Sequence, residues 1–451
     1  MSVDGADPTP RGLLRRGPLR LRPRSDQGRW AEAAAVGLTG AGVTFALSAG
    51  ALTVGARLLA RLPLVPQLGV RQRPDTGVRA VFEDRVHLDS TAESRRGGYL
   101  ALRQSGGATH VRLGPVTGQP TPTTVARPLL AQDTAEELRV DRAKVNGFFW
   151  AGTPATAHGL PTQEVEIDSP VGPMPAWLVR PDPAAGSAPG QERTWAIFVH
   201  GHGATRGEAL RVLPLLHRLG LTSLTVTYRN DIGGPASADR MHHLGSDEWE
   251  DVEAAIEYAL AHGAERLVLL GWSMGGGIAL RTSVRSAHRD RIAALVLDSP
   301  AVDWQDILIY HATALKAPQP MRRLALWMMT SSFGARMVRL HEPLALHEMR
   351  PEHYARTLIH PVLLFHALDD ATVPPAPSRR LASLRPDLVT FEPVEGASHT
   401  REWNRDPARW ERLLTGFLQR SLDLDPAQVP TAFPVRDPGA APEADAIGMR
   451  L

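Results

Sequence analysis

Short apolar runs separated by helical stretches constrain the fold of this chain more than any other feature. The runs have the length and composition of buried strands: Trp195–Val199, Leu224–Thr227, Leu267–Leu270, Ala294–Leu297, Val362–Phe365 and Val389–Glu392. Between two of them, residues 249–261 repeat apolar side chains on one helical face. This alternation predicts an α/β fold with a mostly parallel, twisted sheet and helices on both faces. Ligand sites in such folds lie beyond the carboxyl ends of the strands.

The chain is long enough for a catalytic domain and smaller flanking parts, since its 451 residues exceed the roughly 150 residues of a typical domain. We predict the following division: a basic tail at 1–30, a signal anchor or transmembrane helix at 31–62, a linker and small β-rich appendage at 63–160, an α/β domain at 161–422 with a possible cap at 300–357, and a disordered tail at 423–451. The absence of cysteine excludes disulfides and a cysteine nucleophile. Basic residues gather in the first 30 positions, which argues against a nucleic-acid-binding surface on the folded domain.

An uncharged stretch from Ala33 to Ala56 follows these arginines. About 20 apolar residues suffice to cross a bilayer as a helix, and preceding positive charges stay in the cytoplasm. We therefore expect a single-pass anchor in the cell membrane, with the catalytic part outside the cytoplasm. Two alternatives remain open. One is a cleaved signal peptide with a cleavage site near Ala49-Gly50-Ala51, giving a secreted protein. The other is a packed Gly/Ala-rich helix of a protein without an anchor.

The segment Gly271-Trp272-Ser273-Met274-Gly275 is a G-x-S-x-G motif between an apolar strand and a helical stretch. In that context the motif is typical of a sharp strand-to-helix turn that exposes a nucleophilic serine. A second strand end carries His200-Gly201-His202-Gly203. We predict that the Met274 N–H and the His202 N–H form an oxyanion hole, with Gly203 as the alternative second donor. Further ligands at metal-binding spacing do not accompany His200 and His202, so we predict no metal site and no cofactor.

A serine nucleophile needs a histidine base and an orienting carboxylate. His399 follows the strand at 389–392, and Asp369 and Asp370 follow the strand at 362–365. The order serine, acid, histidine is the one expected for this architecture. Order alone does not choose between the two neighbouring aspartates, and Asp298 at another strand end is a further alternative.

Residues ~160–420 resemble the α/β-hydrolase superfamily, especially its dienelactone-hydrolase-like and prolyl-oligopeptidase-like branch. The run from His366 to Pro374 is similar to that branch's H-G-x-x-D-x-x-V-P motif, which implies that Asp370 is the acid; Ala367 replaces the motif's glycine. With the segments 228–230, 244–249 and 399–404, the pattern also resembles membrane-associated actinobacterial hydrolases. The resemblance implies an α/β-hydrolase fold and the catalytic triad Ser273, Asp370 and His399, but no particular substrate.

Together these features predict a serine hydrolase, like a carboxylesterase or lipase, acting on a small-molecule ester or thioester. Met321, Met328, Met329, Met337 and Met349 lie in the predicted cap region, and they would suit an adaptable apolar pocket or simply pack between helices. A prolyl-oligopeptidase-type peptidase is an alternative, although the residues before 161 are too few for a β-propeller. A membrane-tethered binding protein without catalysis is the other alternative.

Overall fold

The computed structural model describes residues 50–66, 73–181 and 193–424. Contacts divide the chain into two units, Met1–Val54 and Gly55–Leu451, and the following description concerns the second. The expected tail at 1–30 and residues 31–49 of the expected anchor lie outside the described residues, as does most of the expected disordered tail at 423–451.

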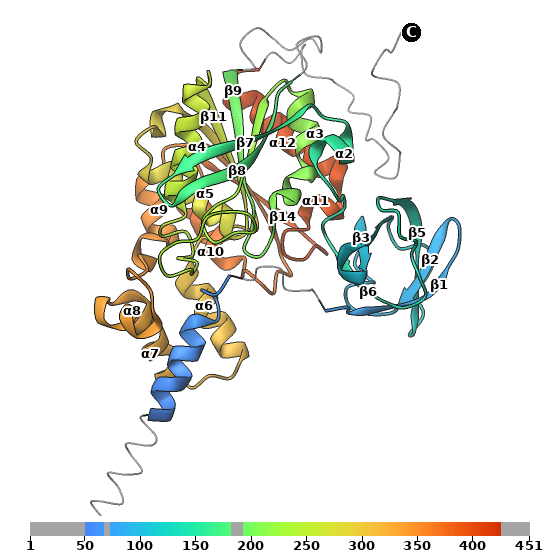
Figure 1. Ribbon diagram of the computed structural model, residues 1–451, viewed down its shortest axis with the longest axis horizontal. Coiled ribbons are helices and arrows are strands. Elements are labelled where there is room, and N and C mark those ends of the chain that lie inside the picture. The colour runs from blue at the N-terminus through green and yellow to red at the C-terminus, as the bar shows by residue number, and fades with distance from the viewer. Residues whose placement is uncertain (1–49, 67–72, 182–192, 425–451) are drawn as a thin grey trace, which may run out of the picture. The chain divides into compact units, whose positions relative to one another are not determined.

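An eight-stranded sheet forms the centre of the larger part of the molecule, in the order β14-β13-β12-β11-β9-β10-β8-β7 (Figure 1). Its strands are β7 (Thr162–Ser169), β8 (Gly172–Val179), β9 (Thr194–Val199), β10 (Thr222–Val226), β11 (Arg266–Trp272), β12 (Ile292–Asp298), β13 (Val362–Ala367) and β14 (Val389–Val394). Strands β9 to β14 pair in parallel, whereas β7 and β8 are antiparallel. Each of the predicted apolar runs lies on one of the parallel strands, so the predicted α/β fold class is confirmed.

Helices cover both faces of this sheet (Figure 1). The helices of this part of the chain, including those in the connection between β12 and β13, are α3 (Leu213–Arg218), α4 (Trp249–Ala261), α5 (Met274–Arg285), α6 (Trp304–Ala314), α7 (Gln319–Thr330), α8 (Ser332–Val338), α9 (Pro351–Thr357), α10 (Ala376–Leu384), α11 (Glu402–Arg405) and α12 (Pro407–Leu422). Helix α4 has the bounds expected from its apolar periodicity. Helices α6 to α9 fill the long connection between β12 and β13, which is where the sequence suggested a cap.

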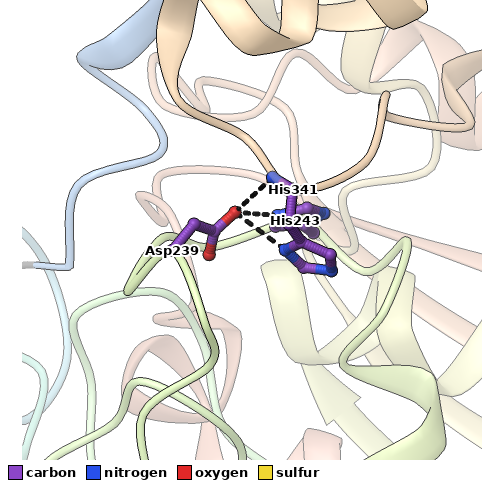
Figure 2. A group of neighbouring side chains, drawn as sticks. All are labelled: Asp239, His243 and His341. Carbon is purple, nitrogen blue, oxygen red and sulfur yellow. Dashed lines mark hydrogen bonds and ion pairs between the residues drawn. The ribbon is translucent and has the colours of Figure 1, made fainter.

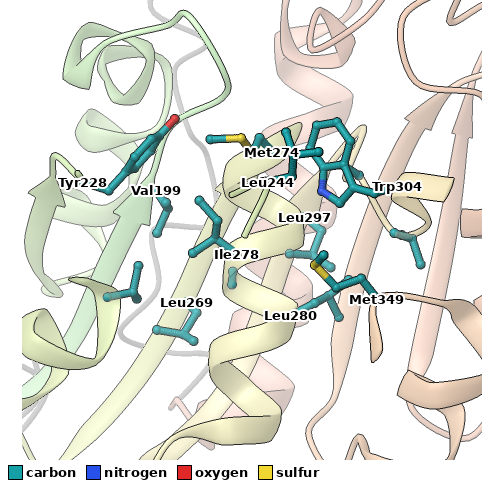
Figure 3. Packing of buried hydrophobic residues seen from close by; sticks show 14 of the residues in the cluster. Val199, Tyr228, Leu244, Leu269, Met274, Ile278, Leu280, Leu297, Trp304 and Met349 are labelled. Carbon is teal, nitrogen blue, oxygen red and sulfur yellow. The ribbon is translucent and has the colours of Figure 1, made fainter. Parts of the chain in front are cut away.

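Two buried clusters hold the helices against the sheet, one on each face. One cluster contains the apolar sides of α4 and α5 with Leu269 and Leu297 from the strands, and Figure 3 shows Ile278 and Leu280 of α5 within it. The other contains α3 and α12, with Trp410 stacked on Phe365 at a ring distance of 5.2 Å. Because strands β9, β11 and β12 are apolar on both faces, they can lie only in the middle of such a three-layer arrangement.

The β-rich region before the sheet is a closed barrel in the order β1-β2-β5-β4-β3-β6. Its strands are β1 (Thr76–Val81), β2 (Arg85–Asp89), β3 (Leu100–Gln104), β4 (Thr109–Leu113), β5 (Thr124–Gln132) and β6 (Arg142–Asn146). A short helix, α2 (Pro154–His158), follows it. The barrel has its own apolar core, which includes Val86, Leu102 and Val111. Closure removes the unpaired edges that an open sheet of this size would expose.

The helix that ends at Arg61 packs onto the α/β part of the chain with its small residues. Ala56 and Ala60 are fully buried in the same cluster as α4 and α5. Arg57 Nε donates to the Met337 carbonyl at 2.8 Å, and Arg61 Nη1 donates to the Val338 carbonyl at 2.6 Å. Residues 55–62 of the expected anchor therefore belong to the unit that contains the α/β sheet. In the described part of the chain, each helix is too short or too polar to cross a bilayer.

Candidate active site

Ser273 lies in the turn between β11 and α5, in a backbone conformation that non-glycine residues rarely adopt. Its φ is 53° and its ψ is −120°. Such a conformation costs on the order of 1–3 kcal/mol and persists only where surrounding structure enforces it. The Ser273 N–H donates to the Asp298 carbonyl at 3.0 Å, and its own carbonyl accepts from the Ala301 N–H at 2.9 Å. These bonds hold the turn in place at the carboxyl end of the sheet.

The flanking glycines of the motif are required by close backbone contacts. A Cβ at Gly271 would lie 2.3 Å from the Gly275 carbonyl oxygen. A Cβ at Gly275 would lie 2.2 Å from the Val199 carbonyl oxygen. Any side chain at either position would push the turn away from the sheet, so the spacing of the motif follows from packing around the serine.

The three predicted triad residues come together, each from a loop beyond a different strand. His399 Nε2 lies 2.7 Å from Ser273 Oγ, and His399 Nδ1 lies 2.7 Å from Asp370 Oδ2. The other carboxylate oxygen of Asp370 accepts from the N–H groups of Thr372 and Val373 at 2.8 and 2.9 Å. These bonds orient the Asp370 carboxylate so that one oxygen faces the imidazole.

The environment of Asp370 keeps this side chain ionised. Burial alone would raise its pKa, but hydrogen bonds from His366 and His399 hold the pKa well below its usual range. The two alternative acids lie elsewhere. Asp369 is exposed. Asp298 is fully buried next to Glu402 and accepts from Trp410 Nε1 at 3.3 Å, and burial together with the neighbouring carboxylate raises its pKa well above its usual value.

The two predicted oxyanion donors lie beside Ser273. Met274 is the first residue of α5, so its N–H has no acceptor within the helix. The loop at 200–203 lies against the nucleophile, since a Cβ on Gly201 would lie 3.1 Å from Ser273 Cβ. The Gly201 N–H donates a hydrogen bond to Glu208 Oε2 at 2.9 Å. The next N–H groups of the loop belong to His202 and Gly203, and His202 lines the same cavity as Ser273.

Comparisons with known protein families match two regions of the chain. Residues 196–413 match the family described as "Alpha/beta hydrolase family". Together with the parallel sheet, this match shows that this part of the chain has the alpha/beta hydrolase fold. Residues 77–146 match "Domain of unknown function (DUF8805)", and this match covers the strands of the barrel almost completely.

Solved structures similar to this hydrolase include esterases and a peptidase. An esterase of Pyrococcus furiosus shares 19% identity over 60% of this chain and 96% of its own, with a TM-score of 0.45. Est1E from Butyrivibrio proteoclasticus shares 19% identity over 58% and 99%, with a TM-score of 0.43. A puromycin-hydrolyzing peptidase of Mycobacterium tuberculosis shares 20% identity over 77% and 54%, with a TM-score of 0.47. At these identities the likeness implies no particular activity for this hydrolase.

The cavity at Ser273 in this hydrolase has a volume of about 400 Å³ and mostly aliphatic walls. Ser273, His399 and His202 lie on one side of it. Helices α6 and α7 supply most of the remaining wall, with Ile307, Leu308, Leu315, Ala325, Leu326 and Met329 among the lining residues. Leu59, Leu62 and Pro63 complete it, so the end of the N-terminal helix is part of the pocket. Sequence reasoning missed this role because these residues belong to a stretch with the composition of a membrane anchor.

The five cap methionines have mixed roles. Met329 lines the cavity, whereas Met328 and Met349 are buried in the core that α4 and α5 share. Figure 3 shows Met349 packed near Ile278 and Leu280. The pocket therefore owes its apolar character to branched aliphatic residues more than to methionine.

The His202 ring is held neutral at the edge of this cavity. Burial, followed by the neighbouring His242, lowers its pKa to about 4. The ring bonds to the Pro63 carbonyl, and among the described residues its Nε2 atom has no hydrogen-bond partner. His200, in contrast, is fully buried and bonds Asp231 Oδ2 through Nε2 at 2.6 Å. His200 therefore holds the first residue of the loop at 200–203 in place, whereas His202 lines the cavity.

A buried ion pair, also missed from the sequence, connects the two loops that flank Ser273. Glu208 accepts the Gly201 N–H and pairs with Arg211 Nη2 at 3.2 Å. Arg211 Nη1 donates to the Thr400 carbonyl, directly after His399, and to Asn404 Oδ1 at 3.0 Å. Both charged side chains are only 4% exposed. Glu208 and Arg211 lie in a short 3-10 helix, Arg206–Arg211. Their spacing did not predict this role, because only the fold brings Thr400 to them.

Proposed function

We propose that this protein is a serine hydrolase that cleaves a carboxylic ester or thioester through an acyl-enzyme. One observation carries the proposal: the His399 ring lies 2.7 Å from Ser273 Oγ on one side and 2.7 Å from Asp370 Oδ2 on the other. Ser273 and His399 also line a cavity with mostly aliphatic walls. A serine and a histidine in contact, with a carboxylate behind the histidine, form the arrangement that acyl transfer requires.

In the proposed mechanism, Ser273 Oγ attacks the carbonyl carbon while His399 Nε2 takes the serine proton. The carbonyl oxygen becomes an oxyanion that accepts hydrogen bonds from the Met274 and His202 N–H groups. His399 then gives the proton to the leaving oxygen or sulfur, which departs as an alcohol or thiol. Water repeats these steps on the acyl-enzyme and releases the acid. Asp370 stays ionised throughout and stabilises the imidazolium.

The walls of the cavity favour a substrate with an apolar acyl group. A volume of about 400 Å³ is at the lower end of the range for small-molecule pockets. Each buried methylene contributes about 0.8 kcal/mol, which corresponds to roughly fourfold in kcat/KM if the transition state gains it. A linear acyl chain is therefore expected to gain activity with length until the cavity is full.

A panel of p-nitrophenyl esters of increasing acyl length, run beside aminoacyl nitroanilides, tests this proposal. We expect ester hydrolysis that rises from acetate over several methylenes and then falls, with negligible nitroanilide hydrolysis. Faster nitroanilide cleavage would instead make the protein a peptidase. No turnover of any substrate, together with no labelling of Ser273 by a fluorophosphonate, would indicate a binding protein.

We also propose that the protein is held at the cell membrane through the N-terminal segment, with the catalytic unit outside the cytoplasm. The uncharged stretch that begins at Ala33 and the preceding arginines support this orientation. Exposed apolar residues at the pocket support a position near lipid: Leu62 is 61% exposed and Leu315 is 62% exposed, and both line the cavity. Exposed apolar patches are typical of surfaces that meet a membrane or a partner.

Because the chain has no cysteine, single introduced cysteines test this topology cleanly. Glu265→Cys lies in the catalytic unit, where the glutamate side chain is half exposed, and Ser2→Cys lies before the uncharged stretch. A membrane-impermeant maleimide is expected to label Glu265→Cys in intact spheroplasts and Ser2→Cys only after lysis. Labelling of both variants only after lysis, with the protein in the soluble fraction, would overturn the proposal.

A further inference from the structure

A cluster of two histidines and two aspartates lies outside the cavity at Ser273. Asp239 and His243 belong to the connection between β10 and α4, and His341 belongs to the segment after α8 (Figure 2). Asp247 lies on the same connection as His243. The nitrogen and oxygen atoms of Asp239, His243 and His341 all lie within 4.8 Å of one another. None of these residues lines the catalytic cavity, so the proposed mechanism does not use them.

Both imidazole rings direct a nitrogen at one oxygen of Asp239, Oδ2, which also accepts from the His341 backbone N–H at 3.0 Å. Asp239 Oδ2 lies 2.7 Å from His243 Nε2 and 2.9 Å from His341 Nδ1. The other oxygen of Asp239 is already occupied, since it accepts from Ser237 Oγ at 2.8 Å and from the Met241 N–H at 3.1 Å. These bonds hold the carboxylate with its second oxygen directed at the two rings.

Asp247 holds both histidines from the opposite side. Its Oδ2 atom lies 2.9 Å from His243 Nδ1 and 3.1 Å from His341 Nε2. At 2.7 and 2.9 Å a proton lies between each ring and Asp239. A metal ion that displaced these two protons would leave each imidazole neutral, with its one N–H donated to Asp247. Metal-binding histidines commonly have this arrangement, in which a carboxylate fixes the tautomer and orients the ring toward the ion.

We infer that Asp239, His243 and His341 form a binding site for a divalent transition metal, best matched by Zn²⁺, with Asp247 as the orienting carboxylate. Two imidazole nitrogens and one carboxylate oxygen are ligands that Zn²⁺ accepts, with water as the fourth. Ligand atoms around tetrahedral zinc lie about 3.3 Å apart, so the three atoms must separate by roughly half an ångström. His341 can make this adjustment because its side chain is 34% exposed, whereas His243 is fully buried.

The site would connect the α8 end of the cap to the loop that supports the catalytic cavity. The residue before His243, His242, donates its N–H to the Leu64 carbonyl at 2.8 Å, and its ring lies 4.8 Å from that of His202. A metal at this position therefore stabilises the cap and the pocket wall through residues outside the cavity, without contacting substrate. A metal site at this position was not predicted from the sequence, because the ligands come from segments about 100 residues apart.

Metal uptake by the full-length, tag-free protein tests the inference directly. After treatment with a chelator and its removal, we expect the protein to take up one Zn²⁺ per chain and to unfold at a higher temperature with Zn²⁺ than without. Co²⁺ in place of Zn²⁺ is expected to give the visible absorption of a four-coordinate site. Neither readout depends on ester hydrolysis, so the inference stands or falls separately from the proposed function.

Substitutions of the proposed ligands test whether Zn²⁺ binds at this cluster. His341→Gln and Asp239→Asn are expected to lose stoichiometric Zn²⁺ uptake, and Asp247→Asn to weaken it by roughly 10–100-fold. His347→Gln is the matched control, since this histidine follows on the same segment and its side chain is 79% exposed. Absence of Zn²⁺ uptake by the wild-type protein, or uptake that survives both His341→Gln and Asp239→Asn, would overturn the inference. So would ¹⁵N shifts that show both rings doubly protonated with Zn²⁺ present.

Discussion

Glu208 and Arg211 form a buried ion pair that connects the loop at Gly201 to the loop that carries His399. One carboxylate oxygen fixes the N–H that precedes the oxyanion donors, and the guanidinium fixes the carbonyl next to the catalytic base. The pair therefore sets the spacing between the proposed oxyanion donors and the proposed catalytic base. Asn404 extends the connection to the barrel, because its Nδ2 donates to the carbonyls of Tyr99 and Gly147 at 2.9 and 3.0 Å.

Arg211→Met is expected to destabilise the protein by about 3–5 kcal/mol, because it leaves Glu208 charged and buried without its partner. Urea unfolding measures this loss. Arg380→Met removes an ion pair in which both side chains are at least half exposed, and it is expected to cost less than about 1 kcal/mol. Similar losses in the two variants would contradict the role assigned to the buried pair. In the folded fraction of Arg211→Met, we expect kcat to fall while KM changes little.

Asp370→Asn is expected to lower kcat on the order of 10⁴-fold, since the asparagine no longer stabilises the imidazolium or selects the productive tautomer. Asp369→Asn serves as the control, because Asp369 is exposed and His399 bonds to Asp370 instead. The kcat for ester hydrolysis at neutral pH is measured for both variants. Equal effects of the two substitutions would show that the acid has been assigned to the wrong residue.

The same carboxylate predicts a dependence of stability on pH. The pKa of Asp370 is lower in the folded protein than in the unfolded chain, where it is about 3.9. Its contribution is therefore fully present above about pH 4 and is lost as the pH falls toward the folded-state pKa. The difference in unfolding free energy between wild type and Asp370→Asn is expected to shrink from pH 6 to pH 3. A difference that grows toward low pH would contradict this sign.

Ala325→Phe is expected to shorten the acyl chains that the enzyme accepts. Ala325 is buried on α7 and lines the cavity, so the added ring occupies space that a longer acyl chain needs. Activity on p-nitrophenyl acetate should persist, whereas activity on the longest ester that wild type accepts should fall at least tenfold. Ala314→Phe, at an exposed position on α6 outside the lining, is the control. An unchanged chain-length profile would place the acyl group elsewhere.

The sheet and the positions of Ser273 and His399 at strand ends could be predicted from local sequence patterns, whereas the choice of Asp370 over Asp369 depended on the resemblance of residues 366–374 to a family motif. Apolar runs define buried strands, and the glycines at 271 and 275 mark a turn that tolerates no side chain. The pocket wall from Leu59 and Leu62 could not be predicted, because Ala56 and Ala60 suit a membrane helix and a tightly packed one equally well. The cluster at His341 and the pair of Glu208 with Arg211 likewise depend on contacts between distant segments.

Labelling of the protein by a fluorophosphonate probe tests the central claim most directly, namely that Ser273 is an activated nucleophile. In wild type we expect a single covalent adduct on the peptide that contains Ser273, together with loss of ester hydrolysis. Ser273→Ala is expected to abolish both the adduct and turnover, while Ser383→Ala, on the exposed side of α10, should leave both unchanged. An adduct that persists in Ser273→Ala, or ester turnover that does not fall in that variant, would contradict the account.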